Sequence, residues 1–333
     1  GRGYGPAEEH PKLFHGVGKF DPDTGNVKAK TEKTFSDAFG EIMCDLASGD
    51  AGVCAITAAM PGGTGLLEFK KKYPKRLFDV GIAEEHAMSM AAGLAKQGMK
   101  PVIALYSTFL QRSYDMILQD ICIQGLHVVI GVDRAGLVGE DGETHHGVFD
   151  VGFLRQAPGM TVLCPASISE LKDMIRWAVL EQNGPVAVRY PRGGDRGYKS
   201  PAWNPTLTVE KCCSGKDWAI ITYGTLVNNA CAAADILGNI GIEASVLRLT
   251  KINPLPIDTL KDALKEYPCI VIVEETCSGS GIYESIAWLL QEKEMHCKVS
   301  HIDLGNQYVT HGSVDTLYRH CVYCCTHTGG AES

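Results

Sequence analysis

The sequence lacks long hydrophobic runs and dense clusters of basic residues. No apolar stretch reaches the roughly 18 to 20 residues that a membrane-spanning helix needs, and the first residues lack the basic and apolar regions of a signal peptide. A formal net charge of −8 at pH 7 argues against a surface that binds nucleic acid. We therefore expect a cytoplasmic protein without a membrane or nucleic-acid partner.

The chain contains 13 cysteines, a number that could suggest disulfides. Cys54, Cys122, Cys164 and Cys269 stand inside apolar segments, where a free thiol behaves as a small hydrophobic group. This distribution favours a reducing compartment.

What the chain does contain is a regular alternation of short apolar runs and longer amphipathic ones, which predicts parallel sheets covered by helices. At 333 residues it exceeds what one hydrophobic core usually serves. We expect two doubly wound α/β domains. The strands predicted for the first domain are 53–59, 77–82, 101–106, 127–133, 161–164 and 186–190, and its helices are 34–47, 84–97, 109–124 and 168–182.

A second set of alternating runs follows the aperiodic stretch 192–205. The strands predicted there are 218–223, 244–249, 270–274 and 299–303, and the helices are 227–240, 257–266 and 281–292. The first residues are rich in glycine, proline and charge. We expect residues 1–30 to be an extended linker from an N-terminal domain that the sequence does not include, 31–197 to form the first domain, and 198–333 to form the second.

Acidic residues follow the second predicted strand, in the segment from Asp79 to Ala87. Glu84 would begin the next helix, where the positive end of the helix dipole stabilises a carboxylate, so Glu84 could act as an ordinary cap. Open α/β sheets also bind ligands at the carboxyl ends of their strands. Glu84 is thus either a structural cap or part of a site.

Three further strand ends carry polar and aromatic groups. Tyr106 and Arg112 follow the third strand, and they are harder to bury without partners than Phe109 or Tyr114. The polar, glycine-containing segment 133–147 follows the fourth strand, which is typical of functional loops. Its adjacent histidines, His145 and His146, lack nearby ligands, so a polar or proton-transfer role is favoured over a metal site.

The last strand of the first domain ends in Val188-Arg-Tyr-Pro-Arg-Gly-Gly194. Arginine suits a phosphate because its planar fork donates two parallel hydrogen bonds and keeps its charge when partly desolvated. Because parallel strands end at one edge, we expect all four segments to converge on a single rim.

Read in order, these segments resemble the pyrimidine-binding domain of transketolase-type thiamine-diphosphate enzymes, and within that group the 1-deoxy-D-xylulose-5-phosphate synthase family. The motifs that carry the resemblance are Phe14-His15-Gly-Val, Tyr106-Ser-Thr-Phe-Leu-Gln-Arg112, Asp133-Arg-Ala-Gly, Arg189-Tyr-Pro-Arg-Gly and His311-Gly-Ser-Val-Asp315. The similarity covers nearly the whole chain. It implies a pyrimidine-binding domain followed by a transketolase C-terminal-like domain.

The resemblance implies a thiamine-diphosphate-dependent transferase that condenses pyruvate with glyceraldehyde 3-phosphate, releases carbon dioxide and forms 1-deoxy-D-xylulose 5-phosphate. This product is a precursor for isoprenoids, thiamine and pyridoxal. By resemblance, the catalytic residues are Glu84, His145 and His15, the cofactor-binding residues are Glu84, Phe109, Ile82 and Arg112, and the substrate-binding residues are Tyr106, Arg134, Asp141 and Arg192. Family members are homodimers, so a homodimer is also implied.

One departure from the family concerns magnesium. Members hold Mg²⁺ and the cofactor diphosphate with Gly-Asp-Gly, followed about thirty residues later by Asn, and we find no such pair here. Neither Gly49-Asp-Ala nor Glu140-Asp-Gly142 qualifies. The expectation is that Mg²⁺ is bound mainly by the absent N-terminal domain, and that this chain is a fragment, a cleaved product or one half of a split enzyme, inactive alone.

A second departure is the C-terminal segment Cys321-Val-Tyr-Cys324-Cys325-Thr-His327, with His320 beside it. It could bind zinc or be redox-active, although a lone cluster is a weak signal. A frayed terminal segment is the favoured interpretation.

Two alternatives remain open. The chain could be the second subunit of a split transketolase or of a 2-oxoacid dehydrogenase first component, which share the two-domain plan; the Phe14-His15-Gly and Tyr106 to Arg112 motifs argue against both. It could also be a non-catalytic dimerisation module. The intact set of Glu84, Arg134, His145 and Arg192 opposes that interpretation.

Overall fold

The structure, a computed structural model, describes residues 1–11, 13–27 and 32–326, and the chain divides into two compact units, Gly1–Lys33 and Thr34–Ser333. The first unit contains one short helix, α1 (Gly5–Glu9). The ring of Phe14 packs edge-on against Tyr4 and Phe20, at centroid distances of 5.7 and 5.2 Å. Phe14, from one of the predicted motifs, thus forms the centre of a small aromatic cluster in this unit.

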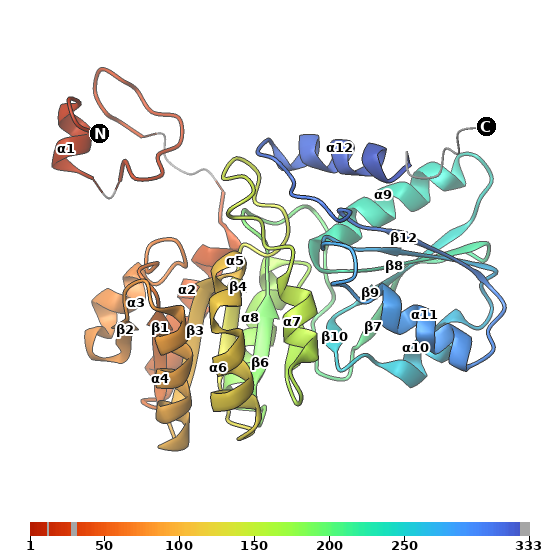
Figure 1. Cartoon of the computed structure of the whole chain (residues 1–333), viewed down its shortest axis with the longest axis horizontal. Helices are drawn as coiled ribbons and strands as arrows, with labels where there is room; N and C mark the ends of the chain where they lie inside the picture. Colours follow the sequence, from red (N-terminus) through yellow and green to blue (C-terminus); the bar gives the residue numbers. More distant parts are fainter. Residues whose placement is uncertain (12, 28–31, 327–333) are drawn as a thin grey trace. The chain divides into compact units, whose positions relative to one another are not determined.

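The second unit contains two sheets (Figure 1). The larger one has seven strands, and every neighbouring pair is parallel except the pair of β10 with β5 at one edge. In order across the sheet, the strands are β10 (Lys251–Asn253), β5 (Thr161–Leu163), β6 (Val186–Arg189), β4 (Val129–Asp133), β3 (Lys100–Tyr106), β1 (Val53–Thr57) and β2 (Leu77–Asp79). The six parallel strands are the six that the sequence predicts, with ends that differ by a few residues.

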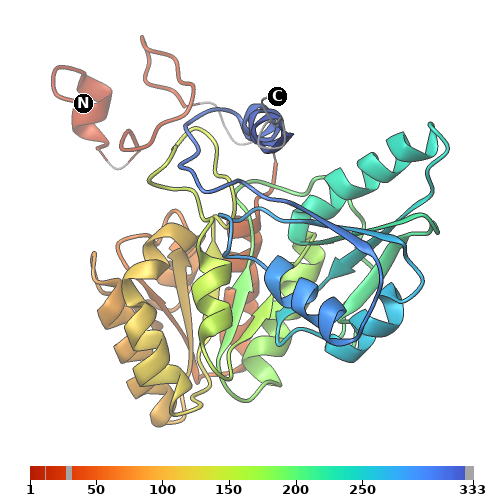
Figure 2. The ribbon, with the colours of Figure 1, turned by 45° about the vertical axis from the view of Figure 1, so that its right-hand side comes forward.

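Helices cover both faces of this sheet, as Figures 1 and 2 show. Successive side chains of a strand point to opposite faces, so in β3 Val102 and Ala104 enter one core cluster while Ile103 and Leu105 enter another. One face is covered by α2 (Phe35–Gly49), α3 (Leu67–Lys72) and α8 (Ile168–Leu180), and the other by α4 (Glu84–Lys96), α7 (Asp150–Gln156) and the helical segment that follows β3. The predicted doubly wound α/β architecture is therefore confirmed for this sheet.

The prediction of one regular helix over residues 109–124 is wrong. The helical segment starts earlier and is broken into four short pieces, which are α5 (Ser107–Leu110), the 3₁₀ turn η2 (Gln111–Ser113), α6 (Tyr114–Met116) and the π turn η3 (Ile117–Cys122). The Ser113 hydroxyl donates to the carbonyl of Leu110 at 2.8 Å, a local bond that competes with the regular helical ladder.

The second sheet has five strands, parallel except for β7 at its edge. In order, they are β12 (Lys298–Ile302), β11 (Cys269–Val273), β8 (Trp218–Tyr223), β9 (Ala244–Leu249) and β7 (Val209–Cys213). Helix α9 (Val227–Gly238) packs on one face, and α10 (Ile257–Leu264) and α11 (Tyr283–Glu292) on the other. The second predicted α/β domain is thereby confirmed as a fold. The remaining short turns are η1 (Pro74–Arg76) and η4 (Gly224–Leu226).

The expectation of a frayed C-terminal segment is also wrong. Helix α12 spans Val314–Thr326, and the Ser313 hydroxyl caps it by accepting from the backbone N–H of Thr316 at 3.2 Å. Leu317 and Cys321, four residues apart, are both buried. The zinc or redox role considered for this segment cannot be followed further, because His327 and the side chains of Cys324 and Cys325 lie outside the described residues.

Over the described part of the chain, no helix combines the length and apolar character needed to cross a bilayer.

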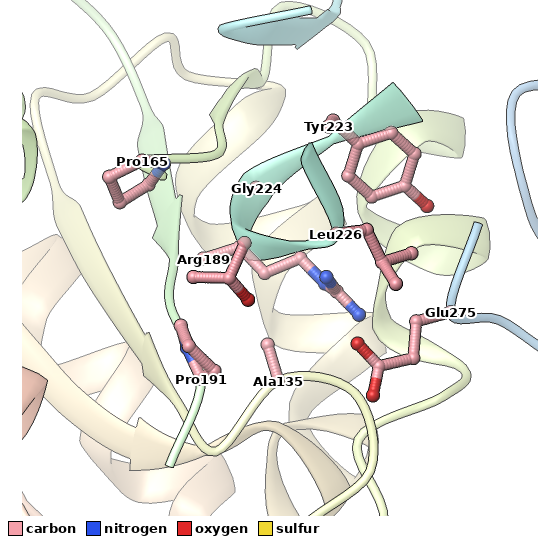
Figure 3. Close-up of a pocket in the computed structure, with 9 residues that line it drawn as sticks. Ala135, Pro165, Arg189, Pro191, Tyr223, Gly224, Leu226 and Glu275 are labelled. Atoms are coloured by element: carbon pink, nitrogen blue, oxygen red, sulfur yellow. The ribbon is translucent and has the colours of Figure 1, made fainter. Parts of the chain in front are cut away.

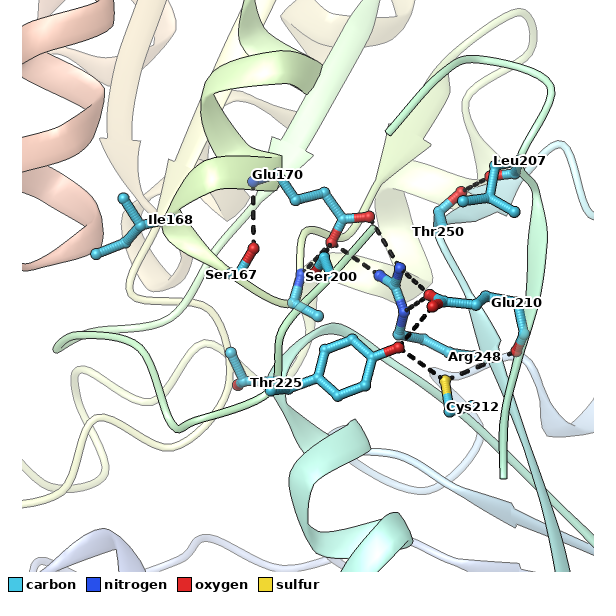
Figure 4. Close-up of polar contacts among 12 residues, drawn as sticks. Ser167, Ile168, Glu170, Ser200, Leu207, Glu210, Cys212, Thr225, Arg248 and Thr250 are labelled. Carbon is cyan, nitrogen blue, oxygen red and sulfur yellow. Dashed lines mark hydrogen bonds and ion pairs between the residues drawn. The ribbon is translucent and has the colours of Figure 1, made fainter. Parts of the chain in front are cut away.

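A buried ion network joins α8 of the first sheet to the second sheet (Figure 4). Arg248 on β9 is fully buried and donates to both oxygens of Glu170 on α8, at 2.8 and 3.0 Å. It also pairs with Glu210 on β7, whose carboxylate accepts from the Tyr198 hydroxyl at 2.7 Å. One guanidinium therefore pairs with two carboxylates from different layers, and loss of this cation would remove the partner of the buried Glu170 carboxylate and of the largely buried Glu210 carboxylate.

We predict that Arg248→Met lowers the free energy of unfolding by about 3–5 kcal/mol, because two desolvated carboxylates lose their partner. Urea denaturation measures this directly. The matched control is Lys216→Ala, which removes an exposed pair with Glu243 and should cost no more than about 1 kcal/mol. A loss of stability for Arg248→Met no larger than that of the control would contradict the assigned role.

Candidate functional site

The carboxyl ends of the parallel strands place the predicted residues along one edge of the first sheet. Spatially, the strands that carry them run β6, β4, β3, β1 and β2. Arg192 follows β6, Arg134 follows β4, Tyr106 ends β3 and Glu84 follows β2. The topology thus gathers residues that are far apart in the sequence. They lie at the edge where open α/β sheets bind their ligands.

The turn from β2 to α4 is fixed by the carboxylate of Asp79. One Asp79 oxygen accepts from the backbone N–H groups of Ala59, at 2.8 Å, and Gly81, at 3.2 Å. Gly81 has a φ of +73°, a conformation that glycine adopts without steric cost. This turn delivers Glu84 to the first position of α4, with its side chain only 2% exposed.

Arg112 partners Glu84. Its Nη1 atom lies 3.2 and 3.1 Å from the two carboxylate oxygens of Glu84. The guanidinium carbon of Arg112 also lies 5.4 Å from the centroid of the Phe109 ring, within range of a cation–π contact. Each Glu84 oxygen keeps further acceptor capacity, so the carboxylate can bind a second donor. Ile82, two residues earlier in the sequence, is an apolar side chain that is 78% exposed.

Two further rings, those of Tyr106 and His145, pack against Phe109. The rings of Phe109 and Tyr106 stack with centroids 5.8 Å apart, and the His145 ring meets Phe109 edge-on at 5.5 Å. The Thr144 hydroxyl lies 2.9 Å from His145 Nδ1. The Phe109 ring therefore stands between the Glu84–Arg112 pair and His145.

The backbone at Gly63 fixes the tip of Tyr106. A Cβ at Gly63 would collide with the Tyr106 hydroxyl, so only glycine leaves room for this ring. Burial raises the pKa of Tyr106, whereas the nearby Arg134 guanidinium partly opposes the shift. The hydroxyl thus keeps its proton and remains a hydrogen-bond donor.

At the far end of the edge, two arginines share one carboxylate. Arg134 and Arg192 both approach the same oxygen of Asp141, with nitrogen–oxygen distances of 3.2 and 2.9 Å. The Arg134 guanidinium also lies 3.9 Å above the Tyr106 ring. Two cations facing one anion leave a local excess of positive charge, which suits a doubly charged phosphate.

Arg134 adopts a φ of +59°, which is uncommon for a residue with a side chain. Such conformations persist where the surroundings impose them, often at functional sites. Here the next residue, Ala135, donates its N–H to the carbonyl of Tyr190 at 3.0 Å, which ties the turn after β4 to the end of β6.

The structure therefore brings eight of the ten predicted site residues into one continuous series of contacts. Glu84 contacts Arg112, Arg112 contacts Phe109, and Phe109 contacts both His145 and Tyr106. Tyr106 then contacts Arg134, and Asp141 pairs with both Arg134 and Arg192. Ile82 precedes Glu84 by two residues in the sequence and is exposed. His15 is exposed and belongs to the first unit, so the described contacts do not include it.

Sequence reasoning missed Gly63, Asp79 as the residue that fixes the turn, and the role of His146. The Pro61-Gly62-Gly63 segment, which begins four residues after the end of β1, was the available signal for the first. The adjacent histidines have different environments: His145 is half-buried in the site, while His146 is buried and bonded on both nitrogens. Among the described residues, no group of three His, Cys, Asp or Glu side chains could hold a metal ion.

Two family profiles match the chain. The profile described as "Transketolase, pyrimidine binding domain" matches residues 31–195, which include the whole edge described above. The profile described as "Transketolase, C-terminal domain" matches residues 208–326.

Curated relatives carry a more specific name. The chain is 43% identical over 328 residues to a 1-deoxy-D-xylulose-5-phosphate synthase from Clostridium acetobutylicum, and the match covers 96% of this chain and 52% of that protein. It is 44% identical to the enzyme of the same name from Heliobacterium modesticaldum, over 95% of this chain and 50% of that protein. The chain thus spans about half the length of the curated relatives it matches.

Solved structures agree on the fold. A chain described as a split gene transketolase in an inactive β4 tetramer superposes with a TM-score of 0.75 at 26% identity, covering 88% of this chain and 97% of that one. A transketolase from Pichia stipitis superposes with a TM-score of 0.71 at 15% identity, over 88% of this chain and 44% of that one.

We predict that Gly63→Ala destabilises the protein by about 1–3 kcal/mol, because the added methyl group must displace the Tyr106 hydroxyl. The neighbouring Gly62→Ala is the control, since its nearest contact would be 3.8 Å away. Urea denaturation compares the two. Adding Tyr106→Phe to Gly63→Ala should recover part of the loss, and equal stabilities for Gly62→Ala and Gly63→Ala would refute the packing described here.

Proposed function

We propose that this chain, which belongs to the transketolase family and carries its pyrimidine-binding and C-terminal domains, is the corresponding half of a 1-deoxy-D-xylulose-5-phosphate synthase. The whole enzyme would condense pyruvate with glyceraldehyde 3-phosphate, with loss of carbon dioxide, in a reaction that depends on thiamine diphosphate. The other half would come from a polypeptide or segment that this sequence does not include.

One observation carries the proposal: the contact series along the strand ends has different chemistry at its two ends. The Glu84 end combines a buried carboxylate, an aromatic ring and an exposed isoleucine, which fits a flat heteroaromatic ring. The Arg192 end combines two arginines and fits a phosphate. Tyr106 and His145 stand between them, where the reacting carbons would lie.

At the first end, Glu84 would accept a hydrogen bond from a nitrogen of the aminopyrimidine ring and hold a proton there. Arg112 keeps the Glu84 carboxylate in place, and Phe109 and Ile82 would pack on the ring. When bound, thiamine diphosphate supplies the nucleophilic carbon and accepts the electrons that decarboxylation releases. The residues of this chain supply orientation and the local electric field.

At the second end, Arg134 and Arg192 would bind the phosphate of the aldehyde substrate, and Asp141 holds both guanidinium groups before the substrate arrives. The Tyr106 hydroxyl, which stays protonated, can donate to an oxygen of the substrate. His145 is the candidate for proton transfer next to the reacting carbon, with His15 as a second candidate from the first unit.

We assign the cofactor diphosphate and its Mg²⁺ to the absent half. The basis is the family motif that this sequence lacks, a Gly-Asp-Gly followed by Asn. A second copy of the assembled enzyme, giving a homodimer, belongs to the same proposal by family resemblance. In this view the chain alone does not turn over substrate.

A second candidate is one subunit of a transketolase encoded in two parts. The likeness to a split gene transketolase favours it, because 97% of that chain is matched by this one. The two candidates differ in their donor substrate: pyruvate for the synthase and a ketose phosphate for transketolase. An assay of the assembled enzyme with each donor decides between them.

We predict that Glu84→Gln lowers kcat by at least about 100-fold in the enzyme assembled with its diphosphate-binding half, because the amide cannot exchange a proton with the ring. The adjacent Glu85→Gln is the control, since Glu85 is exposed on the same turn of α4. Circular dichroism checks that both variants fold. A Glu84→Gln enzyme that works as fast as the control would remove Glu84 from the mechanism.

We predict that Arg192→Ala raises KM for glyceraldehyde 3-phosphate by about 10- to 100-fold, because a charge-assisted contact to the phosphate is lost. The KM for pyruvate, which has no phosphate, should change far less. Arg176→Ala, on the exposed side of α8, controls for the loss of one positive charge. Equal changes in both KM values would argue against a phosphate-binding role.

A further inference from the structure

The segment after β4 is closed into a loop by its own backbone. Gly136 and Gly147 exchange two hydrogen bonds, with nitrogen–oxygen distances of 2.7 and 2.8 Å. We call residues 134–147 the substrate loop, because it carries Arg134, Asp141 and His145. The far end of the loop is held within the first domain, where Arg189 donates to the carbonyl of Gly147 at 3.1 Å.

The C-terminal domain contacts this loop through Glu275, just beyond β11. One carboxylate oxygen of Glu275 accepts the backbone N–H of Leu137 at 2.6 Å. Gly136 packs directly on the same carboxylate, and a Cβ there would collide with it. Leu137 and Glu275 are both buried, so the N–H of Leu137 cannot reach water. The Glu275 carboxylate satisfies this buried backbone donor instead.

A second contact comes from the segment just before α12. His146 Nδ1 accepts from the N–H of Val138 at 3.1 Å, so its proton is on Nε2, which donates to the carbonyl of Thr310 at 3.2 Å. Gly312 donates its N–H to the carbonyl of Gly139 at 3.3 Å. Residues 310–312 include the start of the His311-Gly-Ser-Val motif that the sequence singled out.

The position of Glu275 in the second sheet is informative. The chain runs from β8 to β9 on one side and returns to β11 on the other, so the strand order reverses between β8 and β11. A doubly wound domain ordinarily binds its ligand at this point, outside the carboxyl ends of the strands. Here the remaining cavity is only about 10 Å³ and is lined by residues of both domains, including Arg189, Tyr223 and Glu275 (Figure 3). The first domain therefore fills the place of a ligand.

The surroundings of Glu275 hold its carboxylate in one orientation. Burial raises the pKa of Glu275, and the N–H of Leu137 and the nearby Arg189 and Arg196 oppose that shift. Arg196 in turn donates to the hydroxyl of Tyr318 on α12, at 3.4 Å. Groups from both domains thus surround the carboxylate that receives the loop.

We propose that Glu275 is a positioning residue: from the point where the strand order of the second sheet reverses, it fixes the substrate loop, and through the loop it sets Arg134, Asp141 and His145. The C-terminal domain then acts as a clamp on the acceptor-substrate site. The catalytic consequence rests on the proposed function, whereas the clamp itself is a property of this chain.

Amide hydrogen exchange tests the clamp without any assumption about the reaction. In Glu275→Ala the N–H of Leu137 loses its acceptor, and exchange over residues 136–139 should become at least about 10-fold faster. Glu275→Gln keeps an acceptor oxygen and should stay within about threefold of the wild type. Leu289→Ala, in the core on α11, is the control for general destabilisation.

The same three variants, in the assembled enzyme, test the consequence. Glu275→Ala should raise KM for the phosphorylated aldehyde about 10-fold or more, with a smaller change for pyruvate, and Glu275→Gln should restore most of the difference. The proposal is overturned if exchange in Glu275→Ala matches the wild type, if Leu289→Ala loosens the loop equally, or if both KM values rise together. An assembled wild-type enzyme without activity would contradict the proposed function. The hydrogen-exchange result would still show whether Glu275 holds the substrate loop.

Discussion

The parallel alignment of the strands in the first sheet is the constraint on which the rest of the molecule depends. It brings the carboxyl ends of β6, β4, β3 and β2 to one edge, so residues more than a hundred positions apart, such as Glu84 and Arg192, end a single series of contacts. The series changes character along the edge. A buried carboxylate with one half-exposed cation stands at one end, and two cations with one carboxylate stand at the other. Such a gradient orients a substrate that is polar at one end and anionic at the other.

Much of this was predictable from the sequence because it rests on local patterns. Apolar runs of four to seven residues predicted the six parallel strands of the first sheet. The polar residues that follow these runs predicted the position of the candidate site. Edge strands β7 and β10 were missed because three to five partly exposed residues carry no periodic signal. The breaks at Gln111–Ser113 and Ile117–Cys122 were missed because a single Ser113 side-chain bond and tertiary packing override a helical pattern.

Residues whose roles depend on the partner domain could not be predicted at all. The family resemblance singles out His145, whose ring contacts Phe109, but only the fold assigns its neighbour His146 to a hydrogen bond with the backbone carbonyl of Thr310. Glu275 follows another glutamate, and nothing in the sequence distinguishes them. In the structure Glu274 accepts from Ile282, Tyr283 and Tyr223 within its own domain, while Glu275 reaches Leu137 in the other. Under the proposals made above, the first domain would carry the reactive groups, and the C-terminal domain would hold the loop that bears them.

The central claim is that Glu84 meets the pyrimidine ring of thiamine diphosphate. A structure of the chain assembled with a diphosphate-binding half, with the cofactor bound, tests it most directly. We predict a Glu84 carboxylate oxygen within about 2.6–3.2 Å of a ring nitrogen, with the Phe109 ring in contact with the pyrimidine. A pyrimidine ring bound elsewhere, with Glu84 contacting Arg112 alone, would contradict the account.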